Sequence, residues 1–162
     1  MRRAVITFPL DAIDILRVDC RHLENLFEAF FDADSNLDRR NIIINVCRTF
    51  RTHLVLEETV FYPAVLCGGE IPAEFVTAMD FGGTRALIDA IEHADPEDAD
   101  FDDKVQTLAA HLIRHSVEPN TPQGQFLAAC SSSWDGAAVG RSLLARKEQL
   151  AQNNPRERPS PR

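Results

Sequence analysis

Apolar residues recur at three- and four-residue steps in four stretches of the chain, which is the spacing of amphipathic α-helices. The first stretch, residues 10–32, opens with Asp11, a residue type that caps helix starts. The second stretch, residues 38–66, leads into a loop that begins at Cys67 and contains two glycines. Both stretches are long enough for several helical turns, so we expect two helices here.

Two further stretches continue the same periodicity. Residues 73–93 form the third, although Gly82-Gly83 weaken it, because glycine costs a helix roughly 1 kcal/mol relative to alanine. Residues 101–118 form the fourth, and Pro119 stops it because proline cannot continue a helix. Short polar connections join the four predicted helices.

This pattern predicts an all-α fold. Four amphipathic helices with short connections are typical of an up-down-up-down antiparallel four-helix bundle, which we place at residues 8–130. We expect residues 131–162 to be a C-terminal extension, with a short helix at 137–152 and then a disordered tail rich in proline and arginine.

Composition narrows the class of partner. The chain of 162 residues is 44% hydrophobic, which suits one globular domain. Its net charge of −8 argues against a nucleic-acid partner. No apolar run approaches the ~20 residues of a membrane span, so we expect no membrane partner and a cytoplasmic location. The four cysteines form no C-x-x-C pair and should be reduced there.

Two polar residues fall on the inward face of the second predicted helix. His53 and Glu57 are four residues apart and share a helix face with Phe50 and Val60, so both should point into the interior. A carboxylate in a dry core is unfavourable by several kcal/mol unless it is paired or coordinated. We therefore expect positive charge, or a metal ion, beside Glu57.

Other donors lie at inward positions of neighbouring helices. Cys20 belongs to the apolar face of the first helix, and His115 continues that of the fourth, with Glu118 near the same level. A thiolate, an imidazole and a carboxylate on adjacent helices can hold a divalent transition metal. Without a metal, Cys20 would simply be a small buried residue, and the two histidines would be core side chains with hydrogen-bond partners.

Three segments of the chain resemble the hemerythrin-like, or HHE cation-binding, domain: "DILRVDCRHLENLFEAF", "FRTHLVLEETVFYPAV" and "LAAHLIRHSVEPN". The resemblance covers about residues 8–130. It implies a helical bundle with a non-haem di-iron centre that handles oxygen, nitric oxide or iron. His53 and Glu57 match the ligand pair of the second helix, with Glu57 at the place of a metal bridge.

The resemblance is incomplete at the ligand positions. Cys20 stands at the first-helix histidine position and Phe81 at the third-helix one. His115 matches the fourth-helix histidine, but Pro119 occupies the place of its carboxylate partner. Glu118 is one residue short of that place and would need a distorted helix. The family pattern thus implies one half-site of Cys20, His53 and Glu57, and a second half reduced to His115.

Three functional hypotheses follow. In the first, the protein is a non-enzymatic metal-binding module that holds a single iron or zinc ion for sensing, storage or binding of O2 or NO. In the second, the bundle is metal-free and serves as a structural or protein-interaction domain, with His53 and His115 as the positive charge. A di-iron enzyme is the third, and the ligand count argues against it. A homodimer along the first helix is also expected, since Phe30 and Phe31 cannot both face one core.

Overall fold

The protein is helical throughout the part of the chain that its structure, a computed structural model, describes: residues 10–66, 72–130 and 133–153. No strand occurs within these ranges, so the all-α prediction is confirmed for them. None of their helices is both long and apolar enough to cross a membrane. The tail predicted to be disordered and the predicted loop at Cys67 lie outside the described residues.

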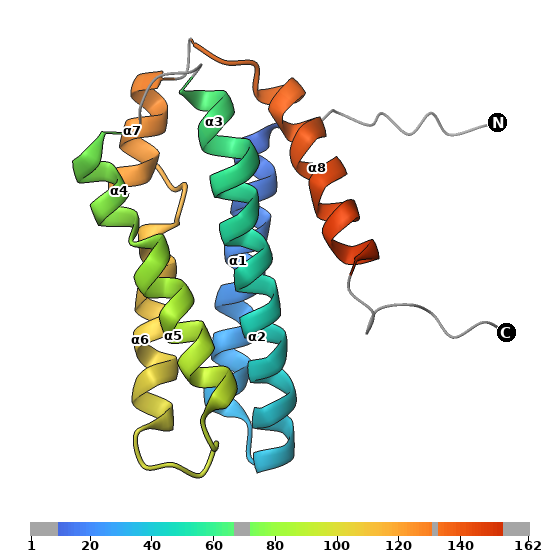
Figure 1. The fold of residues 1–162 in the computed structure, drawn as a ribbon, viewed down its shortest axis with the longest axis vertical. Coiled ribbons are helices and arrows are strands. Elements are labelled where there is room, and N and C mark those ends of the chain that lie inside the picture. Colours follow the sequence, from blue (N-terminus) through green and yellow to red (C-terminus); the bar gives the residue numbers. More distant parts are fainter. Residues whose placement is uncertain (1–9, 67–71, 131–132, 154–162) are drawn as a thin grey trace, which may run out of the picture.

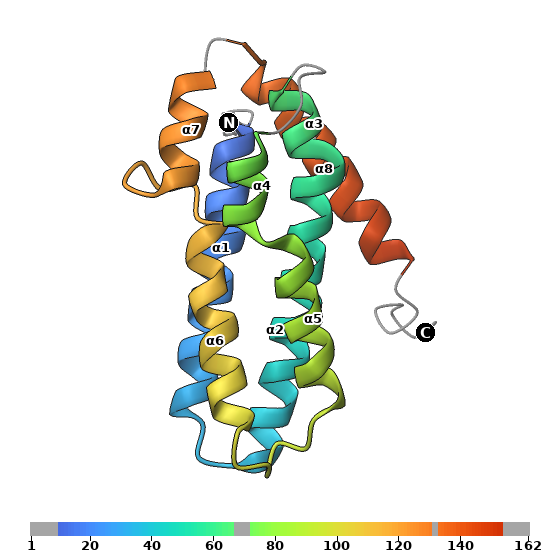
Figure 2. The same ribbon diagram turned by 60° about the vertical axis from the view of Figure 1, so that its left-hand side comes forward.

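Four of the five longest helices of the described chain lie side by side and form the body of the molecule (Figure 1, Figure 2). They are α1 (Ala12–Asp32), α2 (Asn36–Leu56), α5 (Phe81–His93) and α6 (Phe101–Arg114). Helix α1 packs against α2 and α6, and α5 packs against the same two helices. Each long helix therefore touches two others, and their inward faces enclose a core of aliphatic and aromatic side chains.

The first two helices begin at side-chain caps. The carboxylate of Asp11 accepts a hydrogen bond from the N–H of Ile13 at 2.8 Å, and the hydroxyl of Ser35 accepts one from the N–H of Asp38 at 3.0 Å. Such bonds satisfy N–H groups that have no partner within the helix. Asp11 thus has the capping role that the sequence predicts.

The second helical rod continues beyond α2 through a π turn. This turn, η1 (Glu57–Phe61), leads into the short helix α3 (Tyr62–Val65), and the N–H of Tyr62 donates to the carbonyl of Glu57, five residues earlier. Pro63 has no N–H, and in a regular α-helix its ring would clash with the carbonyl four residues before it. The wider π turn relieves that clash and leaves Glu57 and Tyr62 both facing the interior.

The predicted third helix, residues 73–93, consists of two helices. The first, α4 (Ala73–Met79), ends at Asp80, whose backbone is left-handed with φ 47°. The carboxylate of Asp80 accepts a hydrogen bond from the N–H of Gly83 at 3.0 Å and so caps α5. The break therefore falls before the glycine pair and not at it, because the cap stabilises a helix start at this point.

The predicted fourth helix ends earlier than expected. Helix α6 stops at Arg114 with His115 as its C-cap, whereas the sequence pattern predicted a helix to residue 118. The last turn tightens, because the N–H groups of His115 and Ser116 donate to carbonyls only three residues earlier. Pro119 also disfavours helical backbone at the residue before it. Another helix, α7 (Pro122–Cys130), follows in a segment where the sequence predicted none.

Helix α8 (Gly136–Gln152) corresponds to the helix predicted at 137–152 and packs against α1, α2 and η1. Its buried residues lie in its first half, and the helix diverges from α1 and α2 toward its C-terminal end (Figure 1). Gly140 brings the backbone of α8 close to the backbone at the start of α1. Glycine permits this approach because it has no Cβ.

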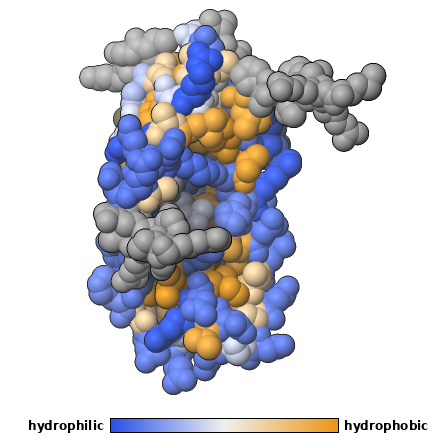
Figure 3. All heavy atoms as spheres, turned by 90° about the vertical axis from the view of Figure 1, so that its right-hand side faces the viewer, coloured by the Kyte–Doolittle hydropathy of each residue, from blue (hydrophilic) through white to orange (hydrophobic). Residues whose placement is uncertain are grey.

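Large hydrophobic side chains left at the surface are spread over several helices. Phe31 on α1 is 48% exposed while its neighbour Phe30 is fully buried, and Ile44 on α2 is 50% exposed. On the face that carries α8, hydrophobic surface occurs as separate patches between hydrophilic residues (Figure 3). The homodimer expected along the first helix stays a prediction.

A side chain at Gly140 should loosen α8 from α1. Its Cβ would meet the carbonyl oxygen of Leu10 well inside van der Waals contact and lie 3.2 Å from the nitrogen of Ala12. We expect Gly140→Ala to lower the free energy of unfolding by about 1–3 kcal/mol in urea denaturation. Gly82→Ala is the control, because open space surrounds that position, and it should stabilise by up to about 1 kcal/mol. Equal effects of the two substitutions would contradict this packing.

Candidate functional site

Glu57, the first residue of η1, lies fully buried inside the molecule. It has no exposed surface, and His53 one turn earlier is only 1% exposed. The inward direction that the helical spacing predicted is therefore confirmed for both residues. The adjacent acid behaves differently: Glu58 forms an ion pair with Arg85, and both of these side chains are about a third exposed, at 32% and 36%.

Three side chains surround the carboxylate of Glu57. His115 Nδ1 donates to Oε2 at 2.6 Å, and Gln123 Nε2 donates to Oε1 at 3.1 Å. His53 Nε2 lies 3.3 Å from Oε1, an ion-pair distance. These partners come from α2, from the C-cap of α6 and from α7, so Glu57 links three separate segments of the fold.

Burial and charge act in opposite directions on this group. Burial alone would raise the pKa of Glu57, but the charges of His53 and His115 and their hydrogen bonds outweigh it and lower the pKa from 4.5 to about 2. Burial also opposes protonation of His53, yet the Glu57 carboxylate and then Cys20 raise its pKa well above 6.5. At neutral pH the interior therefore holds an imidazolium beside a carboxylate.

The thiol of Cys20 completes one side of the group. Cys20 on α1 is 5% exposed, and its Sγ lies 3.8 Å from His53 Nε2. The thiol donates to the backbone carbonyl of His115 at 3.5 Å. That carbonyl is free to accept because Pro119 has no N–H with which to extend α6. The proline that ends the helix thus provides the acceptor that holds the thiol.

Two residues of this group, Gln123 and Tyr62, were not predicted. Gln123 is 1% exposed, and its amide nitrogen also donates to the hydroxyl of Tyr62. Burial raises the pKa of Tyr62 well above 10, so the phenol stays neutral. The one signal for Gln123 was Pro122, a residue type favoured in the first turn of a helix. Tyr62 carried no such signal.

Glu118, one of the predicted candidate ligands, lies outside this buried group. Its side chain is 40% exposed and accepts a hydrogen bond from Nε of Arg17 at 3.1 Å, with Arg21 at 3.8 Å. The early end of α6 places Glu118 in the turn after His115, where it faces the surface. The distorted helix that its ligand role required is absent, since there is no helix at this point in the described chain.

Phe81 stands where the resemblance to hemerythrin-like domains would place a histidine ligand on the third helix. Phe81 packs edge-on against the ring of His115, with the ring centroids 5.2 Å apart. One turn before His115, His111 Nδ1 lies 2.9 Å from the hydroxyl of Thr84. Neither Phe81 nor His111 adds a donor to Glu57.

Cys20, His53 and Glu57 bring a sulfur, a nitrogen and an oxygen donor together, with the sulfur and the oxygen both close to His53 Nε2. Two donors bound to a tetrahedral metal at about 2.0–2.3 Å lie about 3.3–3.6 Å apart. From His53 Nε2 the separations are 3.3 Å to Glu57 Oε1 and 3.8 Å to Cys20 Sγ. Yet no group of three or more His, Cys, Asp or Glu side chains in the described residues is already arranged to hold a metal ion. The donor types fit a single ion, and their mutual contacts would have to open to admit it.

Three buried polar atoms beside Glu57 have no hydrogen-bond partner within the described part of the chain: His53 Nδ1, His115 Nε2 and Gln123 Oε1. An unpaired buried polar atom is unfavourable by about 1–3 kcal/mol. Such atoms are uncommon in native proteins, and functional sites are one place where they persist.

Removing the charge of Glu57 should destabilise the protein far more than removing that of Glu58. Breaking a buried pair leaves the other charge uncompensated, so we expect Glu57→Gln to lower the free energy of unfolding by about 3–5 kcal/mol. Glu58→Gln removes a partly exposed ion pair and should cost at most about 1 kcal/mol. Urea denaturation of the two variants measures both values. Similar losses would show that Glu57 is not part of a buried ion pair.

The contribution of this pair should also depend on pH. Because the pKa of Glu57 is lowered from 4.5 to about 2, its stabilising effect is complete above pH 4.5 and is lost as the pH falls toward 2. The raised pKa of His53 gives an effect that is complete below pH 6.5 and declines as the pH rises above it. In chelator, the difference in unfolding free energy between the native protein and Glu57→Gln should therefore be largest between these two values. A difference independent of pH argues against ionised partners.

Comparisons with known proteins add no assignment to this geometry. No family model matches the chain, and searches of curated proteins and of solved structures find no match either. The likeness to hemerythrin-like domains therefore stays a prediction from the sequence motifs. The observations that bear on function are the buried group around Glu57 and the helices that position it.

Proposed function

We propose that the four long helices form an antiparallel bundle of the hemerythrin-like kind. Two observations support this: α1 and α5 each contact α2 and α6, and the inward faces of all four carry the buried side chains. The site around Glu57 lies toward one end of this bundle, where α7 and η1 meet. In this proposal α7 and α8 are additions that cover that end and one flank.

We further propose that the protein is a metal-binding module that holds a single iron or zinc ion and is not an enzyme. The observation that carries this proposal is that three unlike donors meet in the interior: Cys20 Sγ and Glu57 Oε1 lie 3.8 Å and 3.3 Å from His53 Nε2. Thiolate and imidazole together favour zinc or another thiophilic ion over an all-oxygen site. Iron remains the metal that the hemerythrin-like resemblance implies.

The surrounding residues have roles that suit such a site. His115 donates to the second carboxylate oxygen of Glu57, and Gln123 donates to the first, so both fix the orientation of that carboxylate. The ion would supply Lewis acidity and one open coordination position for a small ligand such as O2 or NO. The thiol of Cys20 must lose its proton on binding, so affinity should fall at low pH.

A second ion has too few ligands in this proposal. The other half-site would need donors at Phe81 and beyond His115, where the chain has an aromatic ring and Pro119. Glu118 is paired with Arg17 at the surface. A single-ion site suits sensing, storage or small-ligand binding better than two-metal chemistry.

A metal-free bundle is the second candidate, and one observation favours it. His115 and Gln123 already hydrogen-bond both oxygens of Glu57, and His53 supplies a positive charge beside it. A buried carboxylate with such partners needs no metal ion. In that case the protein would act as a structural or protein-interaction domain.

Metal content decides between these candidates. For protein purified without chelator, we expect elemental analysis to find about one zinc or iron ion per chain. Cys20→Ser should lower that content at least several-fold, because it removes the sulfur ligand. Cys47→Ser is the matched control, since Cys47 is also buried but lies away from Glu57, and burial raises the pKa of its thiol to about 12.

Stability measurements complete this test. A ligand that binds only the native state must raise its stability, so chelator should lower the melting temperature of the native protein. A metal content far below one ion per chain, with a melting temperature that neither metal nor chelator moves, would contradict the metal-binding proposal. That result would support the metal-free candidate.

A further inference from the structure

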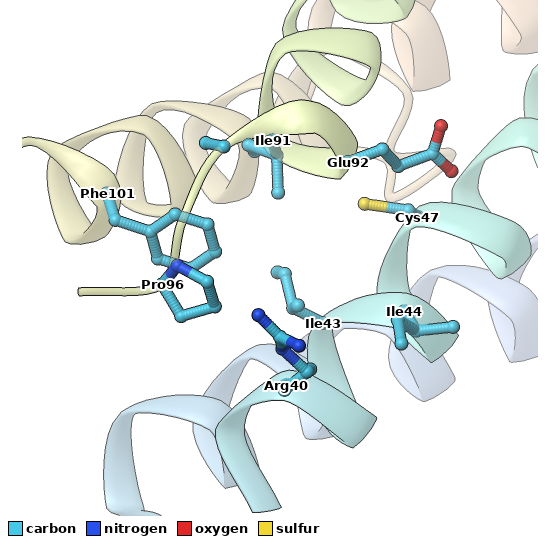
Figure 4. Close-up of a pocket in the computed structure, with 9 residues that line it drawn as sticks. Arg40, Ile43, Ile44, Cys47, Ile91, Glu92, Pro96 and Phe101 are labelled. Atoms are coloured by element: carbon cyan, nitrogen blue, oxygen red, sulfur yellow. The ribbon is translucent and has the colours of Figure 1, made fainter. Parts of the chain in front are cut away.

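A pocket separate from the Glu57 group opens at the other end of the molecule. It lies between α2, the end of α5 and the loop that leads to α6, and its volume is about 500 Å3 (Figure 4). On α2 it is lined by residues about two to four helical turns before His53. Nothing in the metal-binding proposal uses this pocket.

Polar and apolar residues both line the pocket, and part of its wall comes from the core. Ile43 on α2, Ile91 on α5 and Phe101 at the start of α6 are 5%, 2% and 1% exposed, so their positions are fixed by core packing. Ile44 stands at the rim and is 50% exposed. An apolar ligand would remove part of that exposed surface from water, which is favourable.

One positive charge of the lining is available to a ligand. Arg40 reaches from α2 toward Pro96 across the pocket (Figure 4) and has no ion pair or hydrogen bond within the described residues. Glu92 also lines the pocket, but Arg51 holds its carboxylate at 2.6 Å. Arg51 also pairs with Asp89, so the charge of Glu92 is only partly compensated. Its carboxylate is nevertheless held by Arg51, whereas the side chain of Arg40 has no such partner in the described chain.

Two acids stand near Arg40 in an adjoining hollow. They are Asp95 and Glu97, and neither is within ion-pair distance of Arg40. Glu97 accepts a hydrogen bond from Asn36 at 3.3 Å, and Asp95 accepts one from the N–H of Glu97 at 3.0 Å. These bonds hold the two carboxylates within the loop, and Arg40 lines both this hollow and the larger pocket.

We propose that this pocket binds a small carboxylate with an apolar body, such as a medium-chain or aromatic acid. The carboxylate of the ligand pairs with Arg40, since a guanidinium matches a carboxylate with two parallel hydrogen bonds. The apolar body lies against Ile43, Ile91 and Phe101. Cys47 contributes an apolar contact, because its thiol stays protonated and forms no covalent bond.

Titration with three compounds of equal chain length tests this proposal. Octanoate, octylamine and 1-octanol are added to the isotope-labelled protein, and backbone amide shifts are followed by NMR. We expect octanoate to bind with a Kd on the order of 1 mM, typical of so small a ligand, and to shift the amides of the pocket residues. Octanol should bind more weakly, and octylamine most weakly, because Arg40 repels its ammonium group.

Substitutions identify the contribution of Arg40. Arg40→Gln should weaken octanoate binding about fivefold and leave octanol unchanged. Arg141→Gln, at an exposed arginine on α8, is the matched control and should change neither. Ile44→Glu, at the exposed rim, should also weaken octanoate. Octylamine binding as tightly as octanoate, shifts confined to other surfaces, or no binding at about 10 mM octanoate would each overturn the proposal.

Discussion

A carboxylate inside a dry helical core must be met by positive charge or by hydrogen-bond donors, and the rest of the structure around Glu57 follows from this requirement. The carboxylate has no exposed surface, and its partners are His53 one turn earlier and two residues, His115 and Gln123, that lie 58 and 66 residues away in the sequence. An interior of this kind holds its elements in one arrangement, because moving any of them leaves a buried charge unpaired. Glu57 is thus a structural constraint as well as the centre of the candidate site.

Two prolines produce the geometry of that centre. Pro63 favours the π turn that leaves both Glu57 and Tyr62 facing inward. Pro119 ends α6 and frees the carbonyl of His115, which then accepts the thiol of Cys20. At both positions a break in the regular helix adds a polar group to the interior: Tyr62 at the first and the carbonyl of His115 at the second. The departures from regularity and the candidate site therefore have a common cause.

Helical periodicity predicted the long helices and the burial of His53 and Glu57, because a 3.6-residue repeat depends only on local spacing. It did not predict α7, since Gln123 is buried by a contact with Glu57 that lies 66 residues away in the sequence. Periodicity also predicted that the third helix would be weakest at Gly82-Gly83. The helix instead breaks before these glycines, where Asp80 caps α5. Long-range partners and caps depend on the tertiary structure, and the spacing of apolar residues along the chain carries no information about it.

The most direct test of the account is anomalous diffraction from crystals grown with zinc or with ferrous iron under anaerobic conditions. The account predicts one anomalous peak within about 2.0–2.3 Å of Cys20 Sγ, His53 Nε2 and a carboxylate oxygen of Glu57. It also predicts that Glu57 stays inside the helical core. Crystals that show no peak there, or a Glu57 side chain in contact with bulk solvent, would contradict it.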